Sequence, residues 1–167
     1  MNIATEFLQS AVKRSLSYKQ LGDKTFEQLS DPGMHYQPNE ESNSIAIIIQ
    51  HVAGNMLSRW TDFLTTDGEK EWRDRDTEFE IKNSSKQELL LFWEKGWTCY
   101  LAALNNLREA DLLKTIYIRK EPLTVVDAIN RQLAHYPYHV GQVVYIGKMV
   151  RNTGWKNLSM PRNAGKN

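Results

Sequence analysis

The chain has 167 residues, of which 41% are hydrophobic and 25% are charged, and its formal net charge at pH 7 is +1. These values are typical of one globular domain with a sizeable core, and they disfavour nucleic-acid binding through an extended basic surface. Cys99 is the single cysteine, which excludes an intramolecular disulfide and a zinc site made of thiolates alone. Because we find neither a signal peptide nor an apolar run long enough to span a bilayer, we expect a cytoplasmic protein that does not enter membranes.

The first half of the chain contains two segments with helical periodicity. The first runs from about Asn2 to Asp23 and is followed by a loop that contains Asp31-Pro32-Gly33 and Pro38. The second begins at Ser42 or Asn43, both good cap residues, and runs to about Leu64. Its apolar stripe consists of Ile45, Ile49, Val52, Met56, Trp60 and Phe63.

The second half adds two more helical segments. The third opens with Ser85-Lys86-Gln87-Glu88, which has the spacing of a capping box, and it continues to about Leu104. The fourth begins near Thr124 and runs to about Val150. The stretches Thr115–Ile118 and Glu78–Ile81 favour strands but are short.

Four long amphipathic segments in one small domain, residues 1–167, predict an all-α fold, a four-helix bundle. The long connections, residues 24–41 and 65–84, need not join neighbouring antiparallel helices, so we expect a crossover connection. An α+β fold remains the alternative because of the two short strand-favouring stretches.

The fourth segment carries the pair His135 and His139 in the sequence LAHYPYHVGQ. Four residues advance a helix by about 6 Å and rotate it by only about 40°, so both imidazoles point the same way, one turn apart. Two imidazoles in this arrangement can reach one metal ion. Gln132 and Gln142 lie near the same face, three residues beyond either end of the pair.

His51 is the candidate for a third ligand, because it lies at the edge of the apolar stripe of the second segment. Three neutral imidazoles with one or two open positions suit Zn²⁺, Ni²⁺ or a similar divalent ion. A hydrogen-bonded core role is the alternative for each histidine alone; the three together favour a metal. We assign no role to His35, which lies in a loop.

Pro137 and Gly141 are costly residues for a helix interior, about 3 and 1 kcal/mol respectively. A proline kink would change the relative aim of the two imidazoles. The glycine would let another backbone approach. Tight packing of a kinked helix for purely structural reasons explains both residues equally well.

Other polar residues are candidates for the substrate side of the site. Asn55 and Arg59 follow His51 by one and two turns, and we place them with Gln142 behind the ligands or against the substrate. Arg59 could instead pair with an acid in the bundle. The run Asp67–Glu80, rich in both charge signs, is either a lining that holds an anionic substrate or a solvated loop with internal ion pairs. We find no candidate for a general base, so the catalytic residues are unknown.

The histidine pattern and three longer stretches resemble the DinB/YfiT-like superfamily, in particular a bacterial branch of unknown function. The stretches are ESNSIAIIIQHVAGNMLSRWTDFL, DGEKEWRDRDTEFE and AHYPYHVGQVVYIGK, and the similarity covers nearly the whole chain. The resemblance implies a four-helix bundle with an unusual crossover connection, often assembled as a homodimer. It also implies a divalent metal held by three histidines, here His51, His135 and His139.

Some proteins of that superfamily transfer low-molecular-weight thiols such as bacillithiol, while others are isomerases or proposed hydrolases. We therefore expect a divalent-metal-dependent enzyme that acts on a small molecule, in first place an S-transferase that uses a bacillithiol-like thiol as co-substrate. The alternatives are a metal-dependent hydrolase and a non-catalytic metal-binding or interaction bundle.

Overall fold

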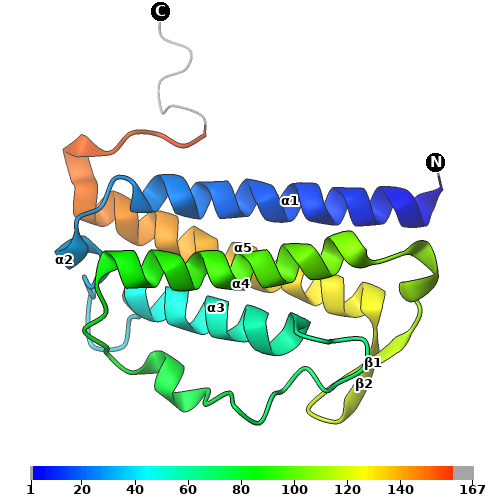
Figure 1. Cartoon of the computed structure of the whole chain (residues 1–167). Coiled ribbons are helices and arrows are strands. Elements are labelled where there is room, and N and C mark those ends of the chain that lie inside the picture. The colour runs from blue at the N-terminus through cyan, green and yellow to red at the C-terminus, as the bar shows by residue number, and fades with distance from the viewer. Residues whose placement is uncertain (1, 160–167) are drawn as a thin grey trace, which may run out of the picture.

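The computed structural model describes residues 2–159, and these residues are mostly helical (Figure 1). Four long helices carry the fold: α1 (Ile3–Phe26), α3 (Ile45–Trp60), α4 (Lys86–Asn106) and α5 (Val125–Arg151). The shorter elements are α2 (Asp31–Met34), η1 (Asp76–Phe79), η2 (Glu109–Asp111), β1 (Thr115–Ile118), β2 (Glu121–Thr124) and η3 (Asn152–Gly154). Within the described part of the chain, no helix is both long and apolar enough to cross a membrane.

Each long helix begins at a residue whose side chain accepts a hydrogen bond from the first turn. Asn2, Ser44, Ser85 and Thr124 cap α1, α3, α4 and α5 respectively. At Ser85 the predicted capping box is present, because the Glu88 carboxylate also accepts from the Ser85 backbone N–H. A cap of this kind stabilises a helix by about 1 kcal/mol, so a helix tends to begin directly after a residue that can cap it. For this reason the helix starts predicted from cap residues lie within about two residues of the observed starts.

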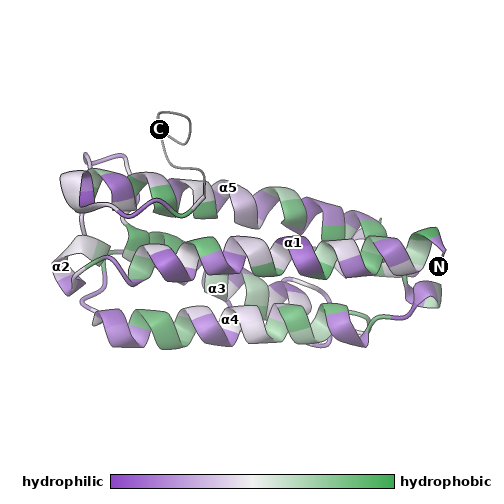
Figure 2. Cartoon of the chain, turned by 90° about the horizontal axis from the view of Figure 1, so that it is seen from above, coloured by the Kyte–Doolittle hydropathy of each residue, from purple (hydrophilic) through white to green (hydrophobic). Residues whose placement is uncertain are grey.

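The long helices pack in a ring in which α1 and α3 occupy opposite corners. α1 packs against α4 and α5, and α3 packs against the same two helices (Figures 1 and 2). The connection from α1 to α3 therefore passes from one corner of the bundle to the opposite one. This arrangement leaves α3 directly beside α5, although 64 residues separate the end of one from the start of the other.

The expectation of a purely helical protein was wrong in one respect, because β1 and β2 form a short antiparallel hairpin. The stretch Thr115–Ile118 is a strand, as its sequence suggested. The stretch Glu78–Ile81 is not a strand, because its first two residues belong to η1 and its last two lie outside any strand. The Asp67 carboxylate holds the hairpin in place, because it accepts hydrogen bonds from the backbone N–H groups of Arg119 and Lys120. Both of these residues have positive φ, as the two central residues of a type I′ hairpin turn do.

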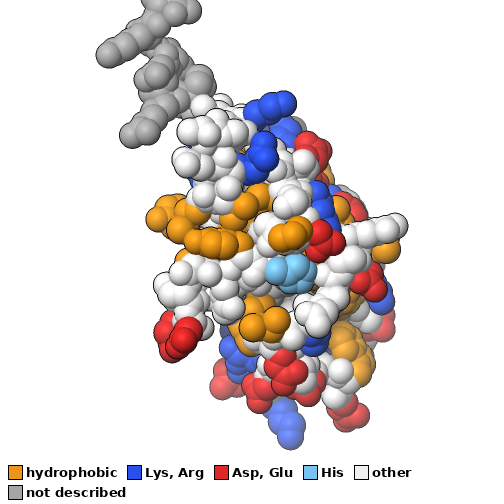
Figure 3. Space-filling model, turned by 90° about the vertical axis from the view of Figure 1, so that its left-hand side faces the viewer, with side chains coloured by type: hydrophobic (Ala, Val, Ile, Leu, Met, Phe, Trp, Pro, Cys, Tyr) orange, Lys and Arg blue, Asp and Glu red, His pale blue; other side chains and the backbone are white. Residues whose placement is uncertain are grey.

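The core is aromatic where α3, α4 and α5 meet. Trp93, Trp97 and Tyr100 of α4 are at most 1% exposed, so they belong to the core and are not available for an interface. Gly96 allows α4 to approach α3 closely, since a methyl group there would lie 2.8 Å from the Cα atom of Ala53. At one end of the bundle, acidic and basic side chains are intermixed on the surface and hydrophobic side chains reach it as well (Figure 3).

Candidate metal centre

Helix α5 brings His135 and His139 together on one face. Their Nε2 atoms lie 3.1 Å apart, as the four-residue spacing predicts. Pro137, between them, leaves the helix continuous from Val125 to Arg151. The pair therefore forms a preset two-nitrogen site on a single element.

Helix α3 supplies the third imidazole. The Nε2 atom of His51 lies 3.3 Å from Nε2 of His135, and one ligand atom from each of the three histidines lies within 4.8 Å of the others. His51 and His139 are buried, while His135 is half-buried. The structure thus brings together the three predicted residues, close enough to hold a metal ion.

The other nitrogen of each ring faces a hydrogen-bond acceptor. Nδ1 of His51 donates to Glu78 Oε2 at 3.1 Å, Nδ1 of His135 to Gln132 Oε1 at 3.3 Å, and Nδ1 of His139 to Gln142 Oε1 at 2.9 Å. An imidazole that donates from Nδ1 and is neutral must carry a lone pair on Nε2. All three rings therefore present lone pairs to one point.

This donor set fits a divalent metal. Two nitrogens bound to a metal at about 2.0–2.1 Å and at the tetrahedral angle lie about 3.3 Å apart, close to the observed separations. Lone pairs at such distances repel one another unless a cation lies between them. The acceptors behind the rings are the usual means by which proteins fix the tautomer and orientation of metal-binding histidines.

The protonation of the pair on α5 also suits metal binding. Burial, together with the neighbouring His139, His51, Arg131 and Arg73, lowers the pKa of His135 to about 3. Burial and the proximity of His51 lower the pKa of His139 as well, although its hydrogen bond to Gln142 acts in the opposite direction. Both rings are therefore neutral at pH 7, which is the form that binds metals.

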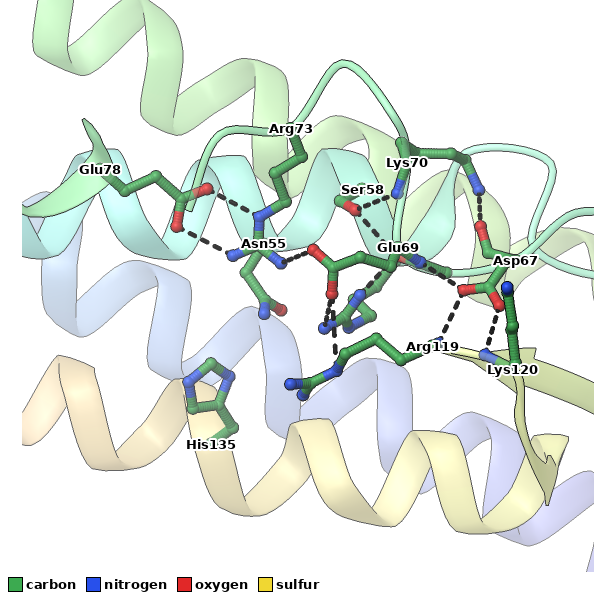
Figure 4. Close-up of polar contacts among 12 residues, drawn as sticks. Asn55, Ser58, Asp67, Glu69, Lys70, Arg73, Glu78, Arg119, Lys120 and His135 are labelled. Atoms are coloured by element: carbon green, nitrogen blue, oxygen red, sulfur yellow. Dashed lines mark hydrogen bonds and ion pairs between the residues drawn. The ribbon is translucent and has the colours of Figure 1, made fainter. Parts of the chain in front are cut away.

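Glu78 is the partner that sequence reasoning did not single out. It lies on η1, and its carboxylate accepts a hydrogen bond from Nδ1 of His51 on one side. On the other side it accepts two from Arg73, from Nε at 2.7 Å and from Nη2 at 2.9 Å (Figure 4). Burial alone raises the pKa of Glu78, but the hydrogen bonds from His51 and Arg73 and the positive charge of Arg73 outweigh it and hold the pKa below the usual range. A buried carboxylate thus stays ionised behind His51.

Gly54 makes room for this carboxylate. It lies one turn after His51 on α3, and a methyl group at this position would stand 2.3 Å from Oε1 of Glu78. Only glycine lets the η1 segment bring Glu78 against α3 without a shift. In the sequence, Gly54 marks only a position on the helix where a neighbouring segment could come close, and it does not identify Glu78 as that neighbour.

The charged run Asp67–Glu80 forms internal ion pairs, the second of its two interpretations. Arg59 was a candidate for contact with substrate, but its guanidinium is buried, donates to the Gly68 carbonyl oxygen and lies 2.8 Å from the Glu69 carboxylate. Arg73 is shared between Glu78 and Glu69. These arginines therefore brace the loop that carries Glu78.

Of the remaining predicted residues, Gln142 is hydrogen-bonded to a histidine of the cluster and Asn55 is hydrogen-bonded to Tyr136. Gln142 lies behind His139, where we expected a supporting residue. Asn55 extends from α3 toward α5 (Figure 4). Its Oδ1 accepts a hydrogen bond from the Tyr136 hydroxyl at 3.2 Å. The interpretation of Gly141 was wrong: no atom of a neighbouring segment lies within 4 Å of a methyl group built there, so it admits no second backbone of this chain.

Comparisons with known proteins give a family without a function. The sequence model of a family described as "Protein of unknown function (DUF1572)" matches residues 2–164. A solved structure described as "Crystal structure of the conserved protein of locus from Enterococcus faecalis" superposes with a TM-score of 0.59 at 18% identity, over 90% of this chain and 98% of that one. At this identity the likeness shows the fold alone. No curated protein sequence matches the chain.

Proposed function

The chain belongs to the family of proteins of unknown function DUF1572, and we propose that it is a divalent-metal-dependent enzyme of the DinB/YfiT type that acts on a small molecule. One observation carries the proposal: three imidazoles, each held by an acceptor at Nδ1, aim their Nε2 atoms at one point. His51, His135 and His139 hold the metal. Zn²⁺ and Ni²⁺ are the ions that suit three imidazoles best.

The number of protein ligands favours catalysis over a purely structural role. Among the described residues, the cluster that could hold an ion contains these three histidines and no fourth His, Cys, Asp or Glu. Structural zinc sites are usually closed by four protein ligands, whereas catalytic ones keep a position open. A divalent ion bound here supplies Lewis-acid chemistry, which lowers the pKa of a thiol or a water molecule.

The surroundings favour thiol transfer over hydrolysis. Hydrolysis of this kind commonly uses a carboxylate or an imidazole as general base. Glu78, the carboxylate bonded to the histidine cluster, is already occupied by His51 and Arg73. Burial raises the pKa of Tyr136 well above its usual value, so its hydroxyl stays protonated.

Thiol transfer does not require such a base, because a thiol of lowered pKa releases its proton to solvent. In the proposed reaction the sulfur of a low-molecular-weight thiol bonds to an electrophilic carbon, and the leaving group departs with its electron pair and takes up a proton. The role of the chain is to hold three neutral imidazoles in place and to exclude water from two of them. A bacillithiol-like thiol is the co-substrate that the family resemblance suggests.

Cobalt substitution tests this function. Protein loaded with Co²⁺ is titrated with 2-mercaptoethanol, and the near-ultraviolet spectrum is followed for a sulfur-to-metal charge-transfer band. We expect a saturable band that is lost in His139→Ala. If Co²⁺ binds and no thiol alters the spectrum, thiol transfer loses its chemical basis and hydrolysis becomes the better candidate.

We also propose that the protein is a homodimer, as the resemblance suggests. Because Trp93, Trp97 and Tyr100 are buried, the interface must use other residues. Light scattering at micromolar concentration should give twice the mass of the chain. A monomeric mass throughout that range would refute the assembly without affecting the metal centre.

A further inference from the structure

The ion pairs of the loop that carries Glu78 leave positive charge in excess. The carboxylate of Glu69 is shared by three guanidinium groups, those of Arg59 at 2.8 Å, Arg73 at 3.6 Å and Arg119 at 3.7 Å (Figure 4). Glu78 is the second acid in this group of ion pairs, and it pairs with Arg73. Three arginines therefore share two carboxylates, and the group can accept one more negative charge.

Arg119 is the arginine of this group that an anion from solvent can reach. Its side chain is 51% exposed, whereas those of Arg59 and Arg73 are 6% and 2% exposed. The Nε atom of Arg119 is also too far from Glu69 for a hydrogen bond. Glu69 does not satisfy the buried arginines either, because Nη1 of Arg73 has no hydrogen-bond partner in the described part of the chain.

The open side of the metal centre is at His135. The rings of Phe79 and Tyr138 pack against those of His51 and His139, with centroids 4.8 Å and 5.0 Å apart. Both of these imidazoles are buried, whereas His135 is half-buried. A molecule from solvent therefore approaches the cluster past His135.

The side chain of Arg119 extends from the hairpin turn toward this open side. Figure 4 shows it directed toward His135, whereas Lys120, the next residue, points away. Lys120 instead lines a separate cavity with residues 63–67 and 115–117. Arg73, which shares Glu69 with Arg119, is among the charges that lower the pKa of His135, so this group of arginines acts on the metal centre.

We propose that Arg119 determines specificity by binding a carboxylate of the thiol co-substrate, next to the open side of the metal centre. The inference rests on the proposed function and sharpens its substrate class to short thiols that carry a carboxylate. A guanidinium suits this task because its planar fork can donate two parallel hydrogen bonds to one carboxylate. The excess of arginines also disfavours a cationic thiol.

Three short thiols that differ in charge test the inference on Co²⁺-loaded protein. 3-Mercaptopropionate is an anion, 2-mercaptoethanol is neutral and cysteamine is a cation. Because their sulfurs also differ in acidity, the deciding quantity is the change in each affinity between protein variants. In the charge-transfer titration, Arg119→Gln should weaken 3-mercaptopropionate about fivefold, the upper end for a half-exposed ion pair, and leave 2-mercaptoethanol unchanged. It should not weaken cysteamine.

Lys120→Gln is the matched control, because it removes the same charge from the same turn. Like Arg119, Lys120 is exposed, has positive φ and donates its backbone N–H to Asp67. This variant should leave all three affinities unchanged. Equal losses in the two variants would overturn the inference and leave the metal centre intact. A loss with Arg131→Gln, an exposed position one turn before His135, in place of Arg119→Gln would overturn it too.

A second measurement does not depend on the metal. In metal-free protein, propionate should shift the side-chain Nε–H resonance of Arg119 and the backbone amide resonance of Glu69, and the amide shift should be lost in Arg119→Gln. Equal shifts with neutral propionamide, or no shift with propionate, would overturn the assignment of Arg119. If Co²⁺ binds no thiol while the propionate shifts appear, the proposed function fails and Arg119 remains a carboxylate site.

Discussion

The carboxylate of Glu78 lies 3.1 Å from Nδ1 of His51, although the two residues are 27 positions apart in the sequence. The contact joins the long loop after α3 back to the middle of that helix. It fixes the tautomer of one imidazole of the cluster, and Arg73 holds the carboxylate in place from the other side. The loop is therefore part of the metal centre and not only a connection between helices.

Gly54→Ala should weaken metal binding without unfolding the protein. The added methyl group would stand 2.3 Å from Oε1 of Glu78, so the carboxylate must move away from His51. Loss of such a supporting contact typically lowers metal affinity 10- to 100-fold, and the gain in helix propensity, about 1 kcal/mol, opposes any loss of stability. Competition against a chromogenic chelator measures the affinity.

Gly141→Ala is the control for that substitution. Gly141 also lies within a long helix, but a methyl group there meets no atom within 4 Å. It should gain about 1 kcal/mol of stability from helix propensity and keep its metal affinity. Equal affinities of the Gly54 and Gly141 variants would show that Glu78 does not support the centre.

Metal should stabilise the folded protein. The site joins α3 to α5, and the unfolded chain does not hold the three imidazoles together. A free Zn²⁺ concentration of about 100 times Kd should add about 2.7 kcal/mol, which corresponds to a rise in Tm of about 5–10 °C for a chain of this size. Calorimetry in the presence of Zn²⁺ and in the presence of a chelator measures this rise in Tm, and His139→Ala is the control that should not show it. If Zn²⁺ leaves the Tm of the natural protein unchanged, as in the control, the prediction is contradicted.

Acid should destabilise the metal-free protein between about pH 6.5 and pH 3. In this range His135 is neutral in the folded protein but becomes protonated in the unfolded chain. Burial and the adjacent His139 and His51 lower its pKa to about 3, whereas the unfolded chain binds a proton near pH 6.5. Because the unfolded state then holds the extra proton, the free energy of unfolding falls as pH decreases from about 6.5 toward 3, by at most about 1.4 kcal/mol per pH unit for this group.

The matching variant is His135→Gln, which cannot titrate. Its stability should depend less on pH between about 6.5 and 3, and urea denaturation at intervals across this range provides the comparison. Glu78, with its lowered pKa, adds a further loss at lower pH in both proteins, when its carboxylate becomes protonated. Identical slopes for the two proteins above pH 4 would exclude His135 as the source.

Local patterns in the sequence predicted the parts of the centre that lie on single helices. The spacing of His135 and His139, the glutamines beside them and the position of His51 on its apolar stripe all follow from helical periodicity, which the caps make reliable. The hairpin was half predicted, because Thr115–Ile118 favours a strand whereas its partner Glu121–Thr124 contains Pro122 and leads into a helix.

The contacts made by loops could not be predicted in the same way. Glu78 lies in a charged run without periodicity, and its position depends on Arg73, Gly54 and the path of the whole connection. The interpretation of Gly141 was wrong, because a methyl group there meets no atom within 4 Å, and the sequence analysis gave no role to Gly54, where the side chain of Glu78 leaves no room for a methyl group. A glycine within a helix indicates a close approach only when the partner is known.

The metal content of tag-free protein tests the central claim most directly. Elemental analysis should find about one divalent ion per chain in the natural protein and a strong loss in His51→Ala, in His135→Ala and in His139→Ala. His35→Ala should keep the ion, because His35 lies outside the cluster, with Nε2 2.9 Å from the Ser84 carbonyl oxygen. Equal metal content in all four variants and the natural protein would contradict a metal centre formed by His51, His135 and His139.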